Sequence, residues 1–222
     1  MRTFAELLER AARRRGGVKA LEREIPKPRA LKELMAIPDD RWLSAMTRGV
    51  FQAGFVWRVV EYKWPGFEAA LVGFDPHVLA YLSDEDLEKL LADTRIIRHH
   101  AKLLATRDNA QFVLDLAEAH GGAGAFFASF GPRRYAELLE VLKKRGARLG
   151  GMTAQYFLRQ MGVESWVLST DVVRVLVDEG VLHRPPSSKR DMQAVQAAFD
   201  HWCEQSGKSL TYVSRVLAMS ID

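Results

Sequence analysis

The stretch from Leu138 to Gly162 constrains the fold of this chain more than any other part of the sequence. Leu138, Leu139 and Leu142 form an apolar stripe at helical spacing that stops at a Lys-Lys-Arg-Gly run. A second stripe follows with i, i+3, i+4, i+7 spacing, at Ala154, Phe157, Leu158 and Met161. Glycine is common just past a helix end, and Gly162 closes the second stripe. The pattern predicts two helices joined by a tight hairpin that contains glycine.

The predicted hairpin has the features of an anion site. Gly150 and Gly151 let the backbone approach another molecule closely. The helix that follows them presents unpaired N–H groups and the positive end of its dipole, which suit a phosphate. Four basic residues surround the turn: Lys143, Lys144, Arg145 and Arg148. An ordinary helical hairpin with a solvated basic face has the same pattern, so both interpretations stay open at this point.

Composition excludes several classes of protein. The 222 residues are enough for one sizeable core or two small lobes, and the longest apolar runs fall short of the roughly 18 residues of a membrane span. Cys203 is the single cysteine, which excludes an internal disulfide and a zinc site with two or more thiolates. The net charge of +4 is compatible with a nucleic-acid partner.

Helical periodicity dominates the chain, and no convincing strand pattern appears, so we predict an all-α protein of about nine or ten helices. Residues 25–38 contain three prolines and read mostly as a connector. A long helix should begin at Asp39 and end at Trp64-Pro65. We therefore predict an N-terminal helix and connector over residues 1–38 and one domain over 39–222, with the hairpin at 138–162.

The hairpin text L-x-x-L-K-K-R-G-x-x-x-x-G-x-T-A-x-x-F-x-x-x-x-G resembles the helix-hairpin-helix element of DNA glycosylases. More closely, it resembles the DNA-3-methyladenine glycosylase I family. The resemblance includes the segments 52–57 and 96–102 and covers about residues 40–180, with the three segments in the family's order. It implies a helix-hairpin-helix glycosylase-like fold with two helical lobes and a cleft between them. The DNA-binding residues it implies are Gly146, Arg148, Gly150, Gly151, Thr153, Lys144, Arg145, Arg98, His99 and Lys102.

Arg98, His99 and Lys102 have a second interpretation. They lie with His100 in one matched segment, whose side chains would reach phosphate or ribose near a flipped nucleotide. A solvated polar helix face explains the same residues.

Asp171 is the candidate catalytic residue. Its distance from the hairpin resembles that of the catalytic aspartate of helix-hairpin-helix glycosylases. Cleavage of a glycosidic bond passes through an oxocarbenium-like state, which a fixed carboxylate stabilises more than the ground state. The carboxylate also orients or deprotonates the attacking water. The alternative is that Asp171 caps the next helix, since aspartate is a good N-cap.

A flipped base needs aromatic faces to replace the stacking it loses. Trp57 matches a pocket tryptophan of the resembled family, whereas Phe51, Phe55 and Tyr62 have no such match. The predicted base pocket comprises Trp57, Phe51, Phe55, Gln52 and Tyr62. The alternative is that these aromatic residues belong to the hydrophobic core.

Two departures from the family, and one contrast with the bifunctional glycosylases of the superfamily, affect the expected chemistry. The family's pocket glutamate is replaced by Gly49, which makes Asp171 more important and Glu61 a rival carboxylate. The family's cysteine and histidine zinc ligands have no counterparts. The bifunctional relatives use a hairpin lysine as nucleophile, and that position is Met152 here.

The reading that accounts for most of these features is a monofunctional DNA glycosylase that hydrolyses the N-glycosidic bond of alkylated purines in base excision repair, with 3-methyladenine as the first candidate. A non-catalytic lesion-binding protein on the same scaffold is the main alternative, and a helical interaction module is a third. We expect no cofactor, no bound metal and no membrane. The expected partner is double-stranded DNA with a damaged base, bound by a monomeric cytoplasmic protein of bacterial type associated with the nucleoid.

Overall fold

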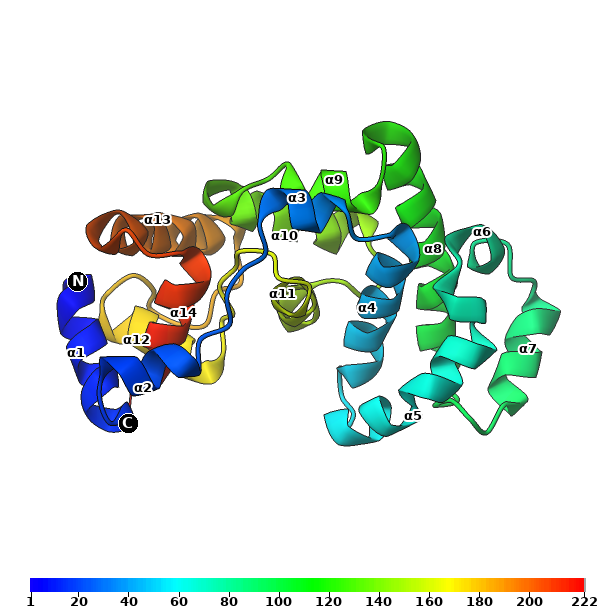
Figure 1. The fold of residues 1–222 in the computed structure, drawn as a ribbon, viewed down its shortest axis with the longest axis horizontal. Helices are drawn as coiled ribbons and strands as arrows, with labels where there is room; N and C mark the ends of the chain where they lie inside the picture. Colours follow the sequence, from blue (N-terminus) through cyan, green and yellow to red (C-terminus); the bar gives the residue numbers. More distant parts are fainter. Residues whose placement is uncertain (222) are drawn as a thin grey trace. The chain divides into compact units, whose positions relative to one another are not determined.

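The computed structural model describes residues 1–221, and within that range every secondary-structure element is a helix (Figure 1). The all-α prediction is confirmed. The elements are α1 (Phe4–Arg15), α2 (Val18–Arg23), α3 (Leu31–Met35), α4 (Asp39–Gln52), α5 (Trp57–Ala70), the 3-10 helix η1 (Val72–Phe74), α6 (Pro76–Leu79), α7 (Asp84–Ala92), α8 (His100–His120), α9 (Ala123–Ala128), the 3-10 helix η2 (Pro132–Arg134), α10 (Tyr135–Arg145), α11 (Gly151–Gln160), α12 (Thr170–Asp178), α13 (Lys189–Ser206) and α14 (Leu210–Met219). The prediction of nine or ten helices is too low, because short helices such as α2 and α9 span too few turns to show a periodic pattern.

The helices group into two compact units. The terminal unit comprises residues 1–29, 130–138 and the chain from Gly162 onward, and the central unit comprises residues 30–129 and 139–161. These units do not coincide with the predicted segments 1–38 and 39–222, because α1 packs on α13 and α14 near the other end of the chain. The chain thus enters the central unit at Ala30, passes through the terminal unit at residues 130–138, and returns to it again at Gly162.

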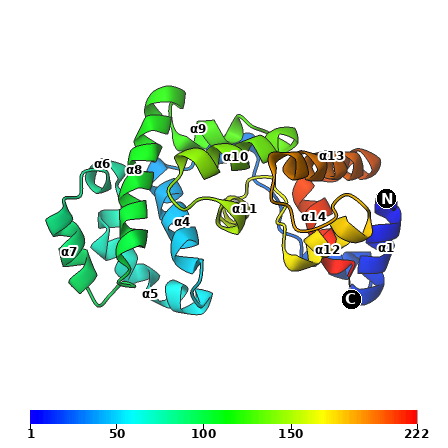
Figure 2. The same ribbon diagram turned by 180° about the vertical axis from the view of Figure 1, so that it is seen from behind.

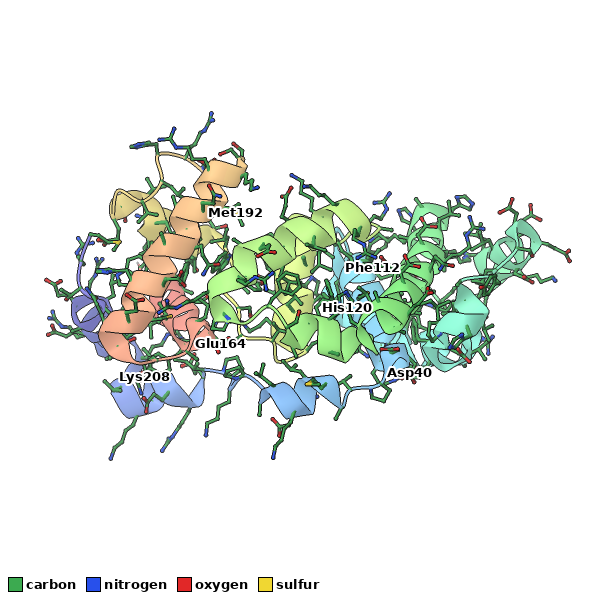
Figure 3. All side chains as sticks on the ribbon, turned by 90° about the horizontal axis from the view of Figure 1, so that it is seen from above. Asp40, Phe112, His120, Glu164, Met192 and Lys208 are labelled. Carbon is green, nitrogen blue, oxygen red and sulfur yellow. The ribbon has the colours of Figure 1, made fainter. Side chains whose placement is uncertain are left out.

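The terminal unit has an aromatic core. The ring of Trp166 stacks on Phe199 with centroids 5.3 Å apart, and Phe199 meets Trp202 edge to face at 5.9 Å. The indole N–H of Trp202 donates to the backbone carbonyl of Arg2 at 3.1 Å, which attaches the N-terminus to this core. The carboxylate of Glu164, which is labelled in Figure 3, accepts a hydrogen bond from the backbone N–H of Leu210 at 2.6 Å.

The central unit is built around α4. This helix lies between α8 and α11 in both views of the ribbon (Figures 1 and 2). Trp42 on α4 is fully buried; it stacks on Phe127 of α9 at 4.4 Å and meets Phe157 of α11 edge to face at 6.0 Å. The periodic apolar face of α4 therefore serves as the wall against which the second hairpin helix packs.

The predicted long helix from Asp39 to Trp64 is wrong. The helix ends at Gln52, the chain turns through Gly54 with a φ of +74°, and α5 starts at Trp57. Pro65 does not end α5 but lies inside it, since Trp64 and Phe67 on either side are buried and hold the helix in place despite the missing N–H. The break creates an exposed loop at residues 53–56 that the periodic pattern concealed.

Candidate functional site

Two hydrogen bonds made by the side chain of Asn109 on α8 hold the turn of the hairpin in place. Its side-chain NH₂ donates to the carbonyl of Ala147 at 3.0 Å, and its amide oxygen accepts the N–H of the same residue at 2.8 Å. Leu149 is fully buried, and a Cβ on Gly146 would come within 2.7 Å of the Leu149 side chain. The turn is therefore a rigid structure that requires glycine at position 146.

The start of α11 has the backbone expected of an anion site. Arg148 and Gly151 have φ values of +59° and +57°, and Gly150, the residue before the helix, offers no side chain to cap it. The first N–H groups of α11 are thus left for water or a ligand. Phosphate is suited to this position because the helix dipole favours negative charge there.

The basic residues around the turn are exposed, but two of them have acidic neighbours. Lys144 forms an i, i+4 pair with Glu140 at 3.2 Å. The guanidinium of Arg145 lies 3.8 Å from the Asp115 carboxylate and 5.0 Å from the ring of Phe112, which is labelled on α8 in Figure 3. Such exposed pairs are weak and are easily exchanged for phosphate contacts.

The predicted base-pocket aromatics occupy different environments. Phe51 is 0% exposed and meets Phe67 edge to face at 4.7 Å, so it belongs to the core and presents no ring face to a ligand. Phe55 and Trp57 are 39% and 43% exposed, and Tyr62 is 85% exposed. Phe55 lies on the loop before α5 and meets His99, Trp57 is the first residue of α5 and meets Tyr156, and Tyr62 is exposed on α5.

Lys102 occupies a different place from the phosphate-facing position that the resemblance implies. It is 4% exposed, and its ammonium group donates to the carbonyls of Phe51 at 3.1 Å and Ala53 at 2.6 Å. The same group lies 4.4 Å from the centre of the Phe55 ring. Burial, and secondarily the charge of Arg148, lower the pKa of Lys102. Lys102 therefore holds the loop that carries Phe55.

The other residues of that matched segment lie nearer the surface. Arg98 and His100 are exposed. His99 is half-buried, is the residue before α8, and meets the ring of Phe55 edge to face at 6.3 Å. The segment thus borders the Phe55 loop, and its contact with DNA stays a prediction.

A cluster of polar side chains lies beside Trp57. The Gln52 amide donates to one oxygen of Glu61 at 2.9 Å, and the Arg48 guanidinium lies 3.5 Å from the other oxygen. Gln52 itself is buried, and its amide oxygen accepts from Gln160 at 3.5 Å. Glu61 was considered from the sequence as a rival to Asp171, but its attachment to Gln52 required the structure.

Tyr156 and Gln160 are site residues that sequence reasoning missed. The ring of Tyr156 meets Trp57 edge to face at 5.0 Å, with an interplanar angle of 88°. Both residues lie on the face of α11 next to its apolar stripe, one helical turn apart. The apolar spacing identified the stripe but contained no signal for a polar neighbouring face.

Asp171 lies in the terminal unit, as the second residue of α12. The N-cap is Ser169, whose hydroxyl accepts from the backbone N–H of Val172 at 3.4 Å. The interpretation of Asp171 as the cap is therefore wrong, and its exposed carboxylate has no capping role. That Asp171 and the aromatic residues line one cleft stays a prediction.

Metal and membrane features were searched over the described part of the chain. Across residues 1–221, no three histidine, cysteine, aspartate or glutamate side chains lie close enough together to hold a metal ion. Within the same range, no helix combines the length and apolar character that crossing a bilayer demands. The expectation that the protein binds no metal stays a prediction.

Comparison with known proteins finds relatives for part of the chain. Residues 38–143 match the model of the methyladenine glycosylase family. The DNA-3-methyladenine glycosylase 1 of Escherichia coli (strain K12) is 37% identical over 67 residues, which are 30% of this chain and 36% of that protein. The DNA-3-methyladenine glycosylase of Haemophilus influenzae is 28% identical over 131 residues, 50% of this chain and 71% of that protein.

The matched part of the chain, residues 38–143, is thus similar to the methyladenine glycosylase family. A solved structure of the 8-oxoguanine DNA glycosylase of Thermotoga maritima covers 96% of this chain and 95% of its own, with a TM-score of 0.53 and 18% identity. At that identity the likeness concerns the fold alone, and it confirms the helix-hairpin-helix glycosylase architecture. The match to the E. coli relative spans about a third of that protein's length.

Gly49 lies at the contact between α4 and α11. Gly49 is buried where α4 crosses α11, and a Cβ there would lie 3.4 Å from the Cβ of Phe157 and 3.5 Å from the methyl group of Thr153. An added Cβ at position 49 would therefore make ordinary contact with α11.

Proposed function

We propose that the chain is a monofunctional DNA glycosylase that hydrolyses the N-glycosidic bond of an alkylated purine such as 3-methyladenine. The observation that carries the proposal is the family match over residues 38–143, which includes the Phe55–Trp57 loop and the Arg98–Lys102 segment. The hairpin that follows supplies exposed basic residues and uncapped N–H groups for the DNA backbone. The partner is double-stranded DNA with a damaged base.

Each part of the proposed site has one task. The hairpin binds phosphate and holds the duplex. The exposed aromatic side chains of Phe55 and Trp57 stack on the bases next to the lesion or on the flipped base. The Asp171 carboxylate stabilises the positive charge that grows on the sugar and orients water. An N-alkylated purine already carries positive charge, so it leaves without strong acid catalysis.

The proposal includes water as the nucleophile. Met152 carries no amine at the first turn of α11. Lys102 is buried and donates to two carbonyls, so its amine is not available to attack a sugar. The expected product is an intact strand with an abasic site. We further propose that the protein acts as a monomer in the cytoplasm, associated with the nucleoid.

The test is base release from DNA treated with a methylating agent. The protein is incubated with this DNA, and the released bases are separated and quantified. Release of 3-methyladenine above the rate of the protein-free control supports the proposal. Tight DNA binding with no released base would support the non-catalytic lesion-binding protein instead, for which the glycine at position 49 is the motivating observation.

A further inference from the structure

The cluster beside Trp57 combines groups from three helices of the central unit. Arg48 and Gln52 lie one turn apart on α4, Trp57 and Glu61 one turn apart on α5, and Tyr156 and Gln160 one turn apart on α11. The helices meet through the Trp57–Tyr156 ring contact and through the chain of hydrogen bonds from Gln160 to Gln52 to Glu61. These six residues are called the Trp57 cluster below.

Glu61 has a fixed position but an open outer side. Gln52 donates to one carboxylate oxygen and Arg48 lies at ion-pair distance from the other. Each oxygen of a carboxylate accepts two hydrogen bonds, so both retain acceptor capacity. The side chain is 47% exposed, so this capacity faces outward.

The partners of Glu61 are themselves held in place. The guanidinium of Arg48 lies 4.4 Å from the centre of the Trp64 ring, and Trp64 is buried. Gln52 is buried and receives the hydrogen bond of Gln160. A carboxylate held by such partners keeps its geometry when a ligand arrives, which lowers the entropy cost of binding.

Trp57 supplies an aromatic face next to this carboxylate. Trp57 is 43% exposed, so its edge-to-face contact with Tyr156 leaves part of the residue open to a ligand. An aromatic face beside a fixed carboxylate suits a flat heterocycle that carries positive charge, because the ring attracts a cation and the carboxylate accepts from its N–H groups. A neutral purine gains neither charge term.

We propose that Glu61 is a specificity-determining residue that selects a cationic, N-alkylated purine over the neutral purines of undamaged DNA. The proposal rests on the proposed function and names the residue that sets its substrate class. Arg48 and Gln52 are positioning residues for Glu61.

The role of Glu61 differs from that of Asp171 in its kinetic consequence. As the glycosidic bond breaks, positive charge leaves the purine and grows on the sugar. A carboxylate beside the purine therefore favours the bound ground state at least as much as the transition state. Its loss should weaken substrate binding and leave the rate at saturation nearly unchanged.

Two methylated adenines of similar shape but different charge test the charge selectivity directly. The probes are 3,9-dimethyladeninium, a permanent cation, and 9-methyladenine, its neutral counterpart, each titrated into the full chain by calorimetry. The wild-type protein should bind the cation at least about tenfold more tightly, and Glu61→Gln should reduce this preference to less than about twofold. Glu88→Gln on α7 removes an equally exposed charge away from the cluster and should keep the preference.

A second measurement separates specificity from catalysis. In single-turnover reactions on methylated DNA, Glu61→Gln should raise the half-saturating protein concentration about tenfold and change the maximal rate by less than about threefold. Glu61→Asp keeps the charge on a shorter arm and should show a smaller increase. Circular dichroism confirms that each variant is folded.

Several results would overturn the proposal. These are a wild-type protein without preference for the cation, a Glu61→Gln protein that retains it, or a maximal rate that falls by orders of magnitude in Glu61→Gln. If the wild-type protein releases 3-methyladenine but shows no preference for the cation, the specificity role of Glu61 is rejected and the proposed glycosylase function stands. If the wild-type protein releases no base, the proposed glycosylase function itself is contradicted.

Discussion

The ammonium group of Lys102 donates a hydrogen bond to the carbonyl of Ala53 at 2.6 Å from a position that is 4% exposed. The contact joins the first turn of α8 to the loop between α4 and α5. It also places a charge under the Phe55 ring at 4.4 Å. The exposed aromatic residues of the loop are therefore supported from the protein interior.

Replacing Lys102 by methionine should destabilise the protein by about 2–3 kcal/mol, because the carbonyls of Phe51 and Ala53 lose their donor. Urea unfolding measures the change. Lys89→Met is the control, since Lys89 is exposed and forms only surface pairs, and it should cost less than about 0.5 kcal/mol. Equal stabilities of the two variants would show that Lys102 does not hold the loop.

Gly151→Ala should weaken binding to every DNA sequence about equally, because the added methyl group stands where the backbone approaches phosphate. The control is Gly207→Ala at the end of α13. Gly151 and Gly207 have φ values of +57° and +64° with no atom within 4 Å of an added Cβ, so both changes cost similar strain of about 1 kcal/mol.

Fluorescence anisotropy with labelled duplexes at several salt concentrations measures this binding. The affinity of the wild-type protein should fall steeply as salt rises. If Gly151→Ala and Gly207→Ala bind as tightly as the wild type, the hairpin is not the phosphate site.

The terminal unit should lose stability at alkaline pH. Burial, with Glu164 second, raises the pKa of Cys203 to about 12. Burial, then the hydrogen bond to Glu22, raises the pKa of Tyr212 to about 12. The unfolded chain releases these protons first, near pH 8.5 and 10 respectively, so the contribution is present at lower pH and lost as pH rises towards 12.

Urea unfolding at pH 8 and at pH 11 measures this loss. Cys203→Ser has no thiol to ionise in this range, so its unfolding free energy should fall less between the two pH values than that of the wild type. A loss of the same size in both proteins would exclude Cys203 as a source of the pH dependence.

Part of this organisation is visible in the sequence and part requires the folded chain. The hairpin is predicted correctly because its two apolar stripes and its glycines are local signals. The break after Gln52 is missed because nothing in the periodicity separates α4 from α5, and Pro65 is tolerated through the burial of Trp64 and Phe67.

The site is predicted less completely, because contacts between helices leave no signal in the spacing of residues. Lys102 reads as a phosphate ligand from its matched segment, whereas its carbonyl partners lie about fifty residues earlier in the chain. Tyr156 and Gln160 acquire meaning only when α11 packs next to Trp57 and Gln52. Residues whose role depends on contacts between helices escape a reading of spacing alone.

No covalent intermediate should form between the protein and DNA. Met152 stands at the first turn of α11, where the bifunctional relatives carry their nucleophilic lysine. Borohydride added during the reaction traps a Schiff base as a stable adduct, which gel electrophoresis detects. We expect no such adduct and an intact strand with an abasic site. A trapped adduct would show that a lysine attacks the sugar, and Met152→Lys provides the comparison for an amine at this position.

Asp171→Asn in single-turnover base release is the measurement that tests the central claim most directly. The substitution keeps the shape of the side chain at the start of α12 and leaves the Ser169 cap intact, but removes the negative charge. Release of 3-methyladenine from methylated DNA should fall by about two to four orders of magnitude, while DNA affinity stays within about twofold of the wild type. Near-normal release by the Asp171→Asn protein would contradict the account and remove Asp171 from the mechanism.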